Sequence, residues 1–321
     1  MGQTSCLPFI IGVNMIKNIL AIVASMFIAT AAFATEITGA GATFPYPIYS
    51  KWADAYKKSS GNQLNYQSIG SGAGMKQIDS KTVTFGATDI PVKPEDLEKK
   101  GQVQFPMIVG GIVPIYHLDG VDHLTLTTDI LAKIYMGKIT KWNDKQIADI
   151  NPGAKLPELG IIKIRRSDGS GTTWNLTRFF SEANADWKKN YGIGQTVEWF
   201  GSTIGCKGND GVASGVGLSN GSIGYVEYAF AKQNDLQTAN MIGTDGKVAA
   251  PSLKTFQSTW PMVATSYIVM YKDPADKDAS KAAIKFFEFG YANDKMAQEL
   301  DYVPLTSAQK ADSKKIWSSI Q

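Results

Sequence analysis

Three glycine-rich turns constrain the fold of this chain, because each joins a strand-like segment to a segment with a helical pattern. They occupy residues 39–45, 69–74 and 168–172, with the sequences Gly-Ala-Gly-Ala-Thr-Phe-Pro, Ile-Gly-Ser-Gly-Ala-Gly and Asp-Gly-Ser-Gly-Thr. Each turn carries a Ser or Thr at the expected helix entrance, where the backbone N–H groups lack partners within the helix. Repeated strand-to-helix connections of this kind predict an α/β fold.

The rest of the chain continues this alternation. Apolar runs predict strands at residues 63–69, 84–87, 107–116, 161–164 and 266–271. Helices are predicted at residues 48–56 and 282–289, and after the third turn. The predicted inner face of that last helix is formed by Leu176, Phe179, Phe180 and Ala183, at i, i+3, i+4 and i+7. No internal repeat or low-complexity tract interrupts the pattern.

Residues 1–34 have the features of a secretory signal peptide. Lys17 precedes the apolar run 19–33, which ends in Ala32-Phe33-Ala34, a cleavage pattern with small residues at both key positions. The run is shorter than the roughly 20 residues of a membrane-spanning helix. We therefore expect cleavage after residue 34. Because Lys17 lies unusually far from Met1, Met15 is an alternative start.

Charge and cysteine content exclude several classes of protein. The net charge is +3, and it would fall to +2 without residues 1–34, so no nucleic-acid partner is expected. Cys206 alone remains after cleavage, which predicts no intramolecular disulfide and a small, buried or half-buried residue without nucleophilic function. Two histidines, His117 and His123, are too few for a metal cluster, and no G-x-S-x-G motif occurs. We expect no metal and no cofactor.

The third turn has the chemistry of an anion site. Arg165 and Arg166 precede a Ser-Gly-Thr helix entrance, which combines positive charge with free N–H groups and the helix dipole. Neighbouring strand residues face opposite sides, so at most one of the two arginines is expected to reach the ligand. Any one turn taken alone also fits an ordinary helix cap, and none has a nucleotide-binding spacing.

Six segments taken together resemble one family. They are residues 38–45, 85–89, 165–172, 207–211, 223–228 and 300–302. In this order, over essentially the whole chain after residue 34, they resemble the phosphate-binding proteins of bacterial phosphate-specific ABC transporters. The resemblance implies a two-lobed α/β periplasmic binding protein of type II, with the ligand in the interlobe cleft. It implies crossings near 105–108 and 260–265, one lobe at 36–107 plus 263–321, and the other at 108–262.

The same resemblance implies the phosphate contacts. They are Thr43, Phe44, Ser71, Asp89, Arg166, Asp168, Ser170, Gly171 and Thr172. Phe44 would use its backbone N–H, since a phenyl ring offers no donor, whereas the hydroxyl residues can donate from side chain and main chain. Arg166 would supply the positive charge, and Asp168 would hold its guanidinium in place.

Asp89 is the expected selectivity element. Near neutral pH phosphate still carries a proton, which a carboxylate can accept, whereas sulfate has none and would meet an unmatched charge. The expected discrimination is roughly 10³-fold or more. Without the resemblance, Asp89 also fits a turn cap before Ile90-Pro91.

These observations predict a monomeric periplasmic protein that binds inorganic phosphate and delivers it to the membrane permease of an ABC transporter, without chemistry on the ligand. A secreted phosphatase on the same scaffold is the alternative, although the few histidines disfavour it. A surface adhesion or signalling protein that senses phosphate is a third hypothesis. Asp89 disfavours molybdate and sulfate as ligands.

Overall fold

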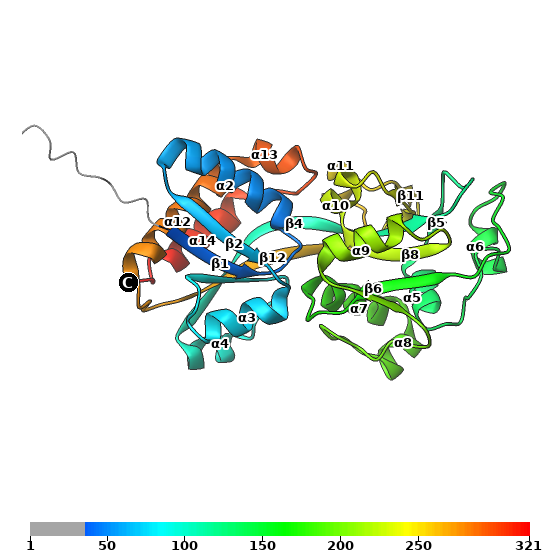
Figure 1. Ribbon diagram of the computed structural model, residues 1–321, viewed down its shortest axis with the longest axis horizontal. Helices are drawn as coiled ribbons and strands as arrows, with labels where there is room; N and C mark the ends of the chain where they lie inside the picture. Colours follow the sequence, from blue (N-terminus) through cyan, green and yellow to red (C-terminus); the bar gives the residue numbers. More distant parts are fainter. Residues whose placement is uncertain (1–35) are drawn as a thin grey trace, which may run out of the picture. The chain divides into compact units, whose positions relative to one another are not determined.

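A nine-stranded sheet organises the fold, in the order β2-β1-β3-β12-β4-β8-β6-β7, with β9 paired to β4 (Figure 1). A separate three-stranded sheet has the order β11-β10-β5. The structure, a computed structural model, describes residues 36–321, and the expected signal peptide lies outside the described residues.

The strands are β1 (Glu36–Gly41), β2 (Gln63–Ser68), β3 (Phe85–Thr88), β4 (Gln102–His117), β5 (Thr125–Leu126), β6 (Ile162–Arg166), β7 (Ile204–Cys206), β8 (Ser222–Glu227), β9 (Gln237–Thr238), β10 (Asn240–Ile242), β11 (Val248–Ala249) and β12 (Val263–Tyr271). The helices are α2 (Tyr46–Ser60), α3 (Ser71–Asp79), α4 (Pro94–Lys100), α5 (Thr128–Tyr135), α6 (Lys145–Asp149), α7 (Gly171–Ala183), α8 (Ala185–Asn190), α9 (Gly208–Gly217), α10 (Tyr228–Gln233), α11 (Leu253–Phe256), α12 (Lys277–Ala292), α13 (Asp294–Gln298) and α14 (Ser307–Trp317).

Two groups of parallel strands form the two lobes. In one lobe β1 lies parallel to β2 and β3, and in the other β6 lies parallel to β7 and β8. Parallel neighbours need crossover connections, which α2 and α3 supply in the first lobe and α7, α8 and α9 supply in the second. Strands joined by such crossovers have their carboxyl ends at the same edge of the sheet. The turns that follow β1, β3 and β6 therefore lie where ligands bind in open α/β sheets.

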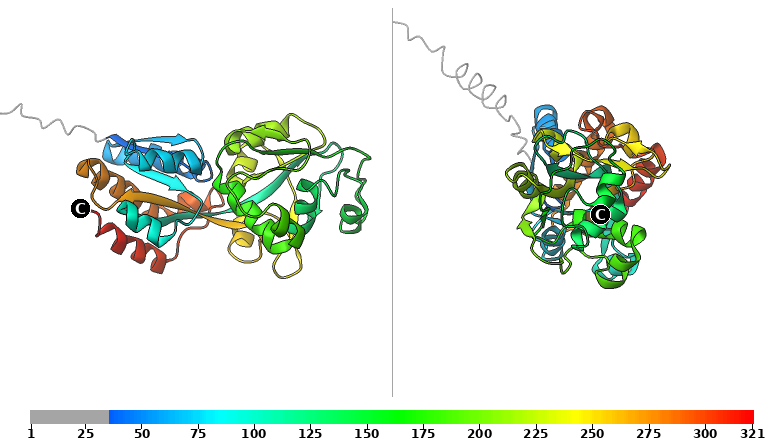
Figure 2. Two further views of the ribbon diagram at one scale, coloured as in Figure 1. Left: turned by 90° about the horizontal axis from the view of Figure 1, so that it is seen from below. Right: turned by 90° about the vertical axis from the view of Figure 1, so that its right-hand side faces the viewer.

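The long strand β4 belongs to both lobes. Residues 102–111 pair with β12, and Ile112 to His117 pair with β8 (Figure 1). Its pairing with β12 shifts register between Ser266 and Tyr267, so the shared ribbon bends at this point. Figure 2 shows β4 and β12 passing side by side from one lobe to the other.

Helices cover the sheet in both lobes. In the first lobe α3 packs on β1 and β3, and α12 packs on β1 and α2. In the second lobe α9 packs on β6 and β8, and α7 packs on α5 and α8. Large aromatic side chains fill the core, including fully buried Trp52, Phe85 and Phe105. No helix within residues 36–321 has the length and apolarity to cross a membrane.

The structure agrees with the sequence predictions for these elements, with small differences. The strand predicted at 107–116 extends over Gln102–His117, and the one predicted at 161–164 runs over Ile162–Arg166. On α7, Leu176, Phe179 and Phe180 are buried as expected. The prediction for Ala183 was wrong: it is exposed, because α7 ends there and the extended backbone at Asn184 begins α8.

Candidate anion-binding site

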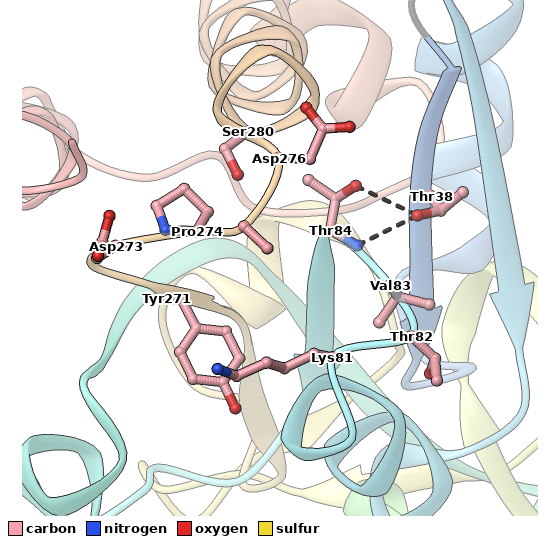
Figure 3. Close-up of a pocket in the computed structure, with 11 residues that line it drawn as sticks. Thr38, Lys81, Thr82, Val83, Thr84, Tyr271, Asp273, Pro274, Asp276 and Ser280 are labelled. Carbon is pink, nitrogen blue, oxygen red and sulfur yellow. Dashed lines mark hydrogen bonds between the residues drawn. The ribbon is translucent and has the colours of Figure 1, made fainter.

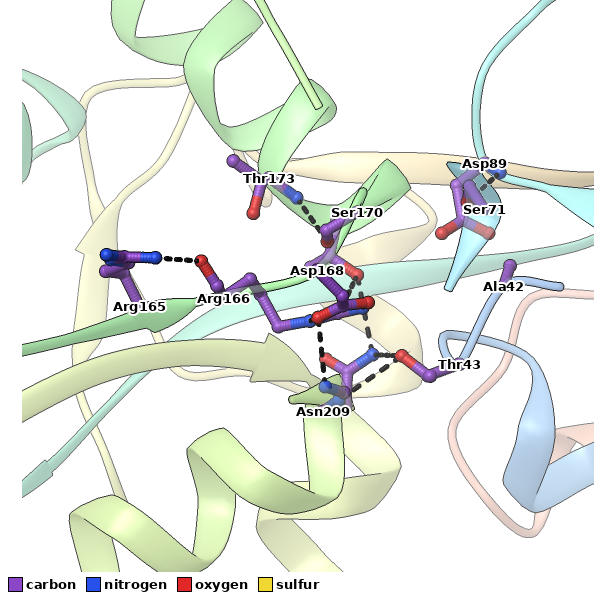
Figure 4. Close-up of polar contacts among 12 residues, drawn as sticks. Ala42, Thr43, Ser71, Asp89, Arg165, Arg166, Asp168, Ser170, Thr173 and Asn209 are labelled. Atoms are coloured by element: carbon purple, nitrogen blue, oxygen red, sulfur yellow. Dashed lines mark hydrogen bonds and ion pairs between the residues drawn. The ribbon is translucent and has the colours of Figure 1, made fainter. Parts of the chain in front are cut away.

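The three glycine-rich turns meet in the structure, so segments from both lobes form one polar cluster (Figure 4). The backbone N–H of Gly72 in the second turn donates to the carbonyl of Gly169 in the third, at 2.9 Å. A Cβ atom built on Gly70 would lie 2.2 Å from Asp168 Oδ2. The lobes are therefore in direct contact at this site.

Most of the predicted contact residues are removed from solvent. The buried ones are Thr43, Phe44, Ser71, Asp89, Arg166, Ser170, Gly171 and Thr172, whereas Asp168 is partly exposed. Buried polar groups need hydrogen-bond partners, so the donors gathered here favour an occupant with several acceptor atoms.

Arg166 is held by a carboxylate in a fixed orientation. Its Nε donates to Asp168 Oδ1 at 2.7 Å and its Nη2 to Asp168 Oδ2 at 2.5 Å. Burial opposes ionisation of Asp168, but Arg166 and the N–H of Gly208 outweigh it and hold the pKa of Asp168 below its ordinary value. The pair leaves both Nη1 protons and one Nη2 proton of Arg166 unused by Asp168.

The two adjacent arginines separate as predicted. The Arg166 side chain is 1% exposed and lies within the cluster. Arg165 instead donates from Nε to Thr203 Oγ1 at 3.2 Å. Its Nη1 donates to the Arg166 carbonyl (Figure 4). Their opposite directions follow from the alternation of side chains along β6.

The amino end of α7 faces the first lobe. Ser170 is the N-cap, and its Oγ accepts from the Thr173 N–H at 3.0 Å, which leaves the hydroxyl proton free to donate. Gly171 and Thr172 are the first two helical residues, so their N–H groups have no acceptor within the helix. The helix dipole adds partial positive charge at the same point.

The first turn presents Thr43 and the main chain of Phe44. Thr43 Oγ1 accepts hydrogen bonds from Asn209 in the second lobe. The Phe44 ring is fully buried and its carbonyl accepts from Tyr302 Oη at 2.7 Å, so the backbone N–H is the group with which Phe44 could bind a ligand.

Asp89 brings a carboxyl group into this cluster of donors. Its backbone N–H donates to Ser71 Oγ at 3.2 Å, and its Oδ1 is buried without a hydrogen-bond partner among the described residues. Burial raises the pKa of Asp89 from 3.8 to about 7. The Ser266 hydroxyl, the Arg166 charge and the Ser71 hydroxyl act in the opposite direction but do not offset burial. Asp89 is thus a carboxyl group at which a proton is easily shared near neutral pH.

Several buried residues of the site were not predicted from the sequence. Asn209 and Asn175 join the lobes through side-chain amides, and Tyr302 contacts both Phe44 and Glu227. Asn209, Glu227 and Tyr302 lie in segments 207–211, 223–228 and 300–302, which carried the family resemblance without an assigned role. Their contacts join residues far apart in the chain, so sequence spacing could not reveal them.

Other features contribute little to this site. Within residues 36–321 no cluster of three or more metal-ligating side chains occurs. Cys206 is half-buried, and burial raises its pKa, which agrees with the prediction that it is not a nucleophile. A pocket lined by Lys81, Thr84 and Tyr271 lies at the amino ends of β1 and β3, away from the glycine-rich turns, and contains none of the predicted contact residues (Figure 3).

The fold and site define a class of protein: an α/β solute-binding protein with its polar cluster between two lobes. The family model described as "PBP superfamily domain" matches residues 29–294. Among solved structures, the phosphate-binding protein from Stenotrophomonas maltophilia aligns with a TM-score of 0.67 at 18% identity, over 88% of this chain and 93% of that one. An ABC-type phosphate transport receptor from Vibrio cholerae aligns with a TM-score of 0.59 at 18% identity, over 84% and 100%. At these identities the likeness concerns the fold.

Sequence relatives identify the family within this class. The phosphate-binding protein PstS of Pasteurella multocida is 42% identical, over 93% of this chain and 98% of its own. The protein of the same name from Haemophilus influenzae is 42% identical, over 90% and 94%. This chain belongs to the PstS family of phosphate-binding proteins. The family is one of solute-binding proteins and not of enzymes, so the phosphatase alternative is not supported.

Proposed function

We propose that this protein binds inorganic phosphate between its two lobes and delivers it to the permease of a phosphate ABC transporter. It would act as a monomer in the periplasm, after removal of residues 1–34. The names of the relatives and the chemistry of the buried cluster support this proposal. The proposed lobes are residues 36–107 plus 263–321 and residues 108–262.

One observation carries the proposal: Asp89 is a buried acceptor within a set of donors. The residues proposed to contact phosphate are Thr43, Phe44, Ser71, Asp89, Arg166, Ser170, Gly171 and Thr172, with Asp168 holding Arg166. Hydroxyl and N–H donors suit the unprotonated oxygens of an anion, and Arg166 supplies charge. Only a protonated oxygen suits the Asp89 carboxylate.

This arrangement favours phosphate over sulfate. Phosphate near neutral pH presents unprotonated oxygens together with a P–OH group, so Asp89 can accept its proton. Sulfate presents four unprotonated oxygens, so wherever Asp89 is ionised, above its pKa of about 7, its carboxylate would repel a sulfate oxygen. An unmatched buried polar or charged group of this kind discriminates by about 10³-fold or more.

Contacts between the lobes connect binding with transport. The Gly72–Gly169 and Asn209–Thr43 hydrogen bonds join segments of both lobes around the ligand contacts. Phosphate that binds groups from both lobes would favour this closed arrangement over an open one, since a ligand shifts an equilibrium toward the conformation it binds better. The closed form would be the one that the permease recognises.

Calorimetric titration of ligand-stripped protein with phosphate and then sulfate tests the proposal. We expect tight phosphate binding and no measurable sulfate binding. In Asp89→Asn, phosphate should bind more weakly and sulfate should gain affinity, because the amide can donate to an unprotonated oxygen. Failure of folded protein to bind phosphate would contradict the proposal.

Asp79→Asn provides a matched control for charge. Asp79 lies at the carboxyl end of α3, the helix that begins at Ser71, and it pairs with Lys100 at 2.6 Å on the surface. This variant changes net charge by the same unit as Asp89→Asn. We expect it to leave the preference for phosphate over sulfate unchanged, and a gain in sulfate binding here would mean that net charge sets the preference.

A further inference from the structure

Asn209 occupies a position between proposed ligand groups of the two lobes. It lies in the first turn of α9 and is fully buried. Its Nδ2 is 2.6 Å from Thr43 Oγ1 in the first lobe (Figure 4) and 3.4 Å from Thr172 Oγ1 in the second. We propose that Asn209 is a positioning residue that directs the Thr43 and Thr172 hydroxyl protons at the ligand. The inference rests on the proposed function and deepens it.

The orientation of the Asn209 amide follows from its third partner. The backbone N–H of Glu227 donates to Asn209 Oδ1 at 3.1 Å. A backbone N–H can only donate, so the atom facing it must be the amide oxygen. The Nδ2 group, which can only donate, is therefore the one that faces the two threonines.

This orientation limits what Thr43 can do. Thr43 Oγ1 accepts from both Asn209 Nδ2, at 2.6 Å, and the Asn209 backbone N–H, at 3.2 Å. A hydroxyl has two lone pairs and one proton, so two accepted bonds leave only the proton. Thr43 can then donate to a ligand oxygen but cannot accept from a protonated one.

Thr172 has the same arrangement in the other lobe. Its Oγ1 accepts from Asn209 Nδ2 and from Arg166 Nη1, both at 3.4 Å. Both bonds are long, but each donor has no lone pair to offer, so the remaining proton of Thr172 points away from them. A single buried amide thus contributes to the direction of two hydroxyls that belong to different lobes.

The two threonines therefore influence which oxygen of the bound phosphate carries the proton. With Thr43 and Thr172 restricted to donating, a P–OH group finds no acceptor at these positions. Among the proposed contacts Asp89 is then the charged acceptor for the ligand proton, whereas the Ser71 and Ser170 hydroxyls are neutral and each already uses one lone pair. Asn209 would therefore place the protonated oxygen of phosphate at Asp89 without touching the ligand itself.

A double-mutant cycle between Asn209→Ala and Thr43→Val tests the inference, with phosphate affinity measured by calorimetry. We expect each single variant to weaken binding by about 10- to 100-fold, since a hydrogen bond to a charged group is lost or misdirected. If Asn209 acts partly through the Thr43 hydroxyl and partly through Thr172, the double variant should bind more tightly than the product of the two single losses predicts. Multiplied losses would overturn the inference.

Asn175→Ala is the matched control in the same cycle. Asn175 is also a buried amide that joins the lobes, because its Nδ2 donates to the Asp89 carbonyl at 2.7 Å and to the Gly171 carbonyl at 3.0 Å. Carbonyls have no proton to direct, so Asn175 cannot act through the Thr43 hydroxyl. The fold-losses of phosphate affinity in Asn175→Ala and Thr43→Val should therefore multiply in the double variant. Equal non-additivity for Asn175 and Asn209 would mean that both serve only lobe contact, which would also overturn the inference.

Asn209→Asp provides a second, nearly isosteric variant. A carboxylate can still accept from the Glu227 N–H, but it would attract the Thr43 and Thr172 protons away from the ligand. We expect binding at least as weak as in Asn209→Ala, and near-normal affinity would contradict the inference. If the unaltered protein does not bind phosphate, the proposed function fails first. If it binds and the cycle is additive, the inference fails alone.

Discussion

The Asp89 carboxyl lies against the backbone of Gly171, so that a Cβ on Gly171 would come within 2.6 Å of Asp89 Oδ2. The same Cβ would be 2.5 Å from Ser71 Oγ. Real Cβ atoms do not approach other atoms so closely. The absence of a side chain at Gly171 therefore allows the amino end of α7 to reach the turns of the other lobe.

Gly171→Ala should weaken phosphate binding by at least about tenfold, because closure would require Ser71 and Asp89 to shift. The ligand-free protein can relieve the clash by opening, so its melting temperature should change little. Calorimetry and thermal unfolding measure the two effects. Gly160→Ala is the control, since its Cβ would meet nothing nearer than 4.0 Å, and equal affinity losses in both variants would contradict this explanation.

Asp89 should make the stability of the ligand-free protein depend on pH. Burial raises its pKa to about 7 from an ordinary 3.8, so the folded state retains the proton that the unfolded state releases. This contribution is fully present below pH 3.8 and is lost as pH rises through about 7. The loss amounts to about 4 kcal/mol. Urea unfolding between pH 3.5 and 8 should show it as the difference between the unaltered protein and Asp89→Asn, and a constant difference would contradict it.

Arg166→Lys should weaken phosphate binding by about 100-fold or more. The planar Arg166 guanidinium bonds Asp168 at two points and has further N–H groups left for a ligand. Lysine keeps the charge but has no guanidinium, so it cannot do both. Arg165→Lys is the matched control, because Arg165 bonds Thr203 outside the cluster, and we expect its affinity to stay within about threefold. Equal losses of phosphate affinity at the two positions, measured by calorimetry, would rule out a specific contact between Arg166 and phosphate.

Glu227 should be protonated in the folded protein. Tyr302 Oη lies 2.7 Å from both the Phe44 carbonyl and Glu227 Oε2, but it has one proton to donate. A protonated Glu227 can donate to Tyr302, which then donates to Phe44. Burial also raises the pKa of Glu227 well above its ordinary value.

Two variants distinguish this arrangement from a carboxylate. Glu227→Gln keeps a donor to Tyr302 but gives up the bond that Glu227 Oε2 accepts from the Ala229 N–H, so it should cost only about 1 kcal/mol at neutral pH. Tyr302→Phe should cost about 1–3 kcal/mol, because it leaves the Phe44 carbonyl and the Glu227 proton unpaired. Because a raised pKa makes stability fall as pH rises, Glu227→Gln should also lessen the loss of stability at alkaline pH. Urea unfolding measures both, and a large loss in Glu227→Gln at pH 7 would indicate an ionised Glu227.

Local patterns in the sequence determined the elements and much of the proposed site. Period-two and period-3.6 apolar spacing predicted the strands and the buried face of α7, except at Ala183, the last residue of the helix. Turn chemistry marked the helix entrances at Ser71 and Ser170, because cap and glycine preferences act over a few residues. The family resemblance supplied the roles proposed for Asp89 and Asp168, which no spacing rule could provide.

Only the tertiary structure decided which groups meet across the lobes. Asn209 lies 166 residues from Thr43, and Tyr302 lies 258 residues from Phe44, yet each pair is hydrogen-bonded. The close approach of Gly171 to Asp89, and the burial that raises the pKa of Asp89, likewise arise where α7 packs against the turns of the first lobe. Hydrogen-bond direction and desolvation depend on distances between groups remote in sequence. The chain's local chemistry therefore determined the donors available, and folding determined which of them face a ligand.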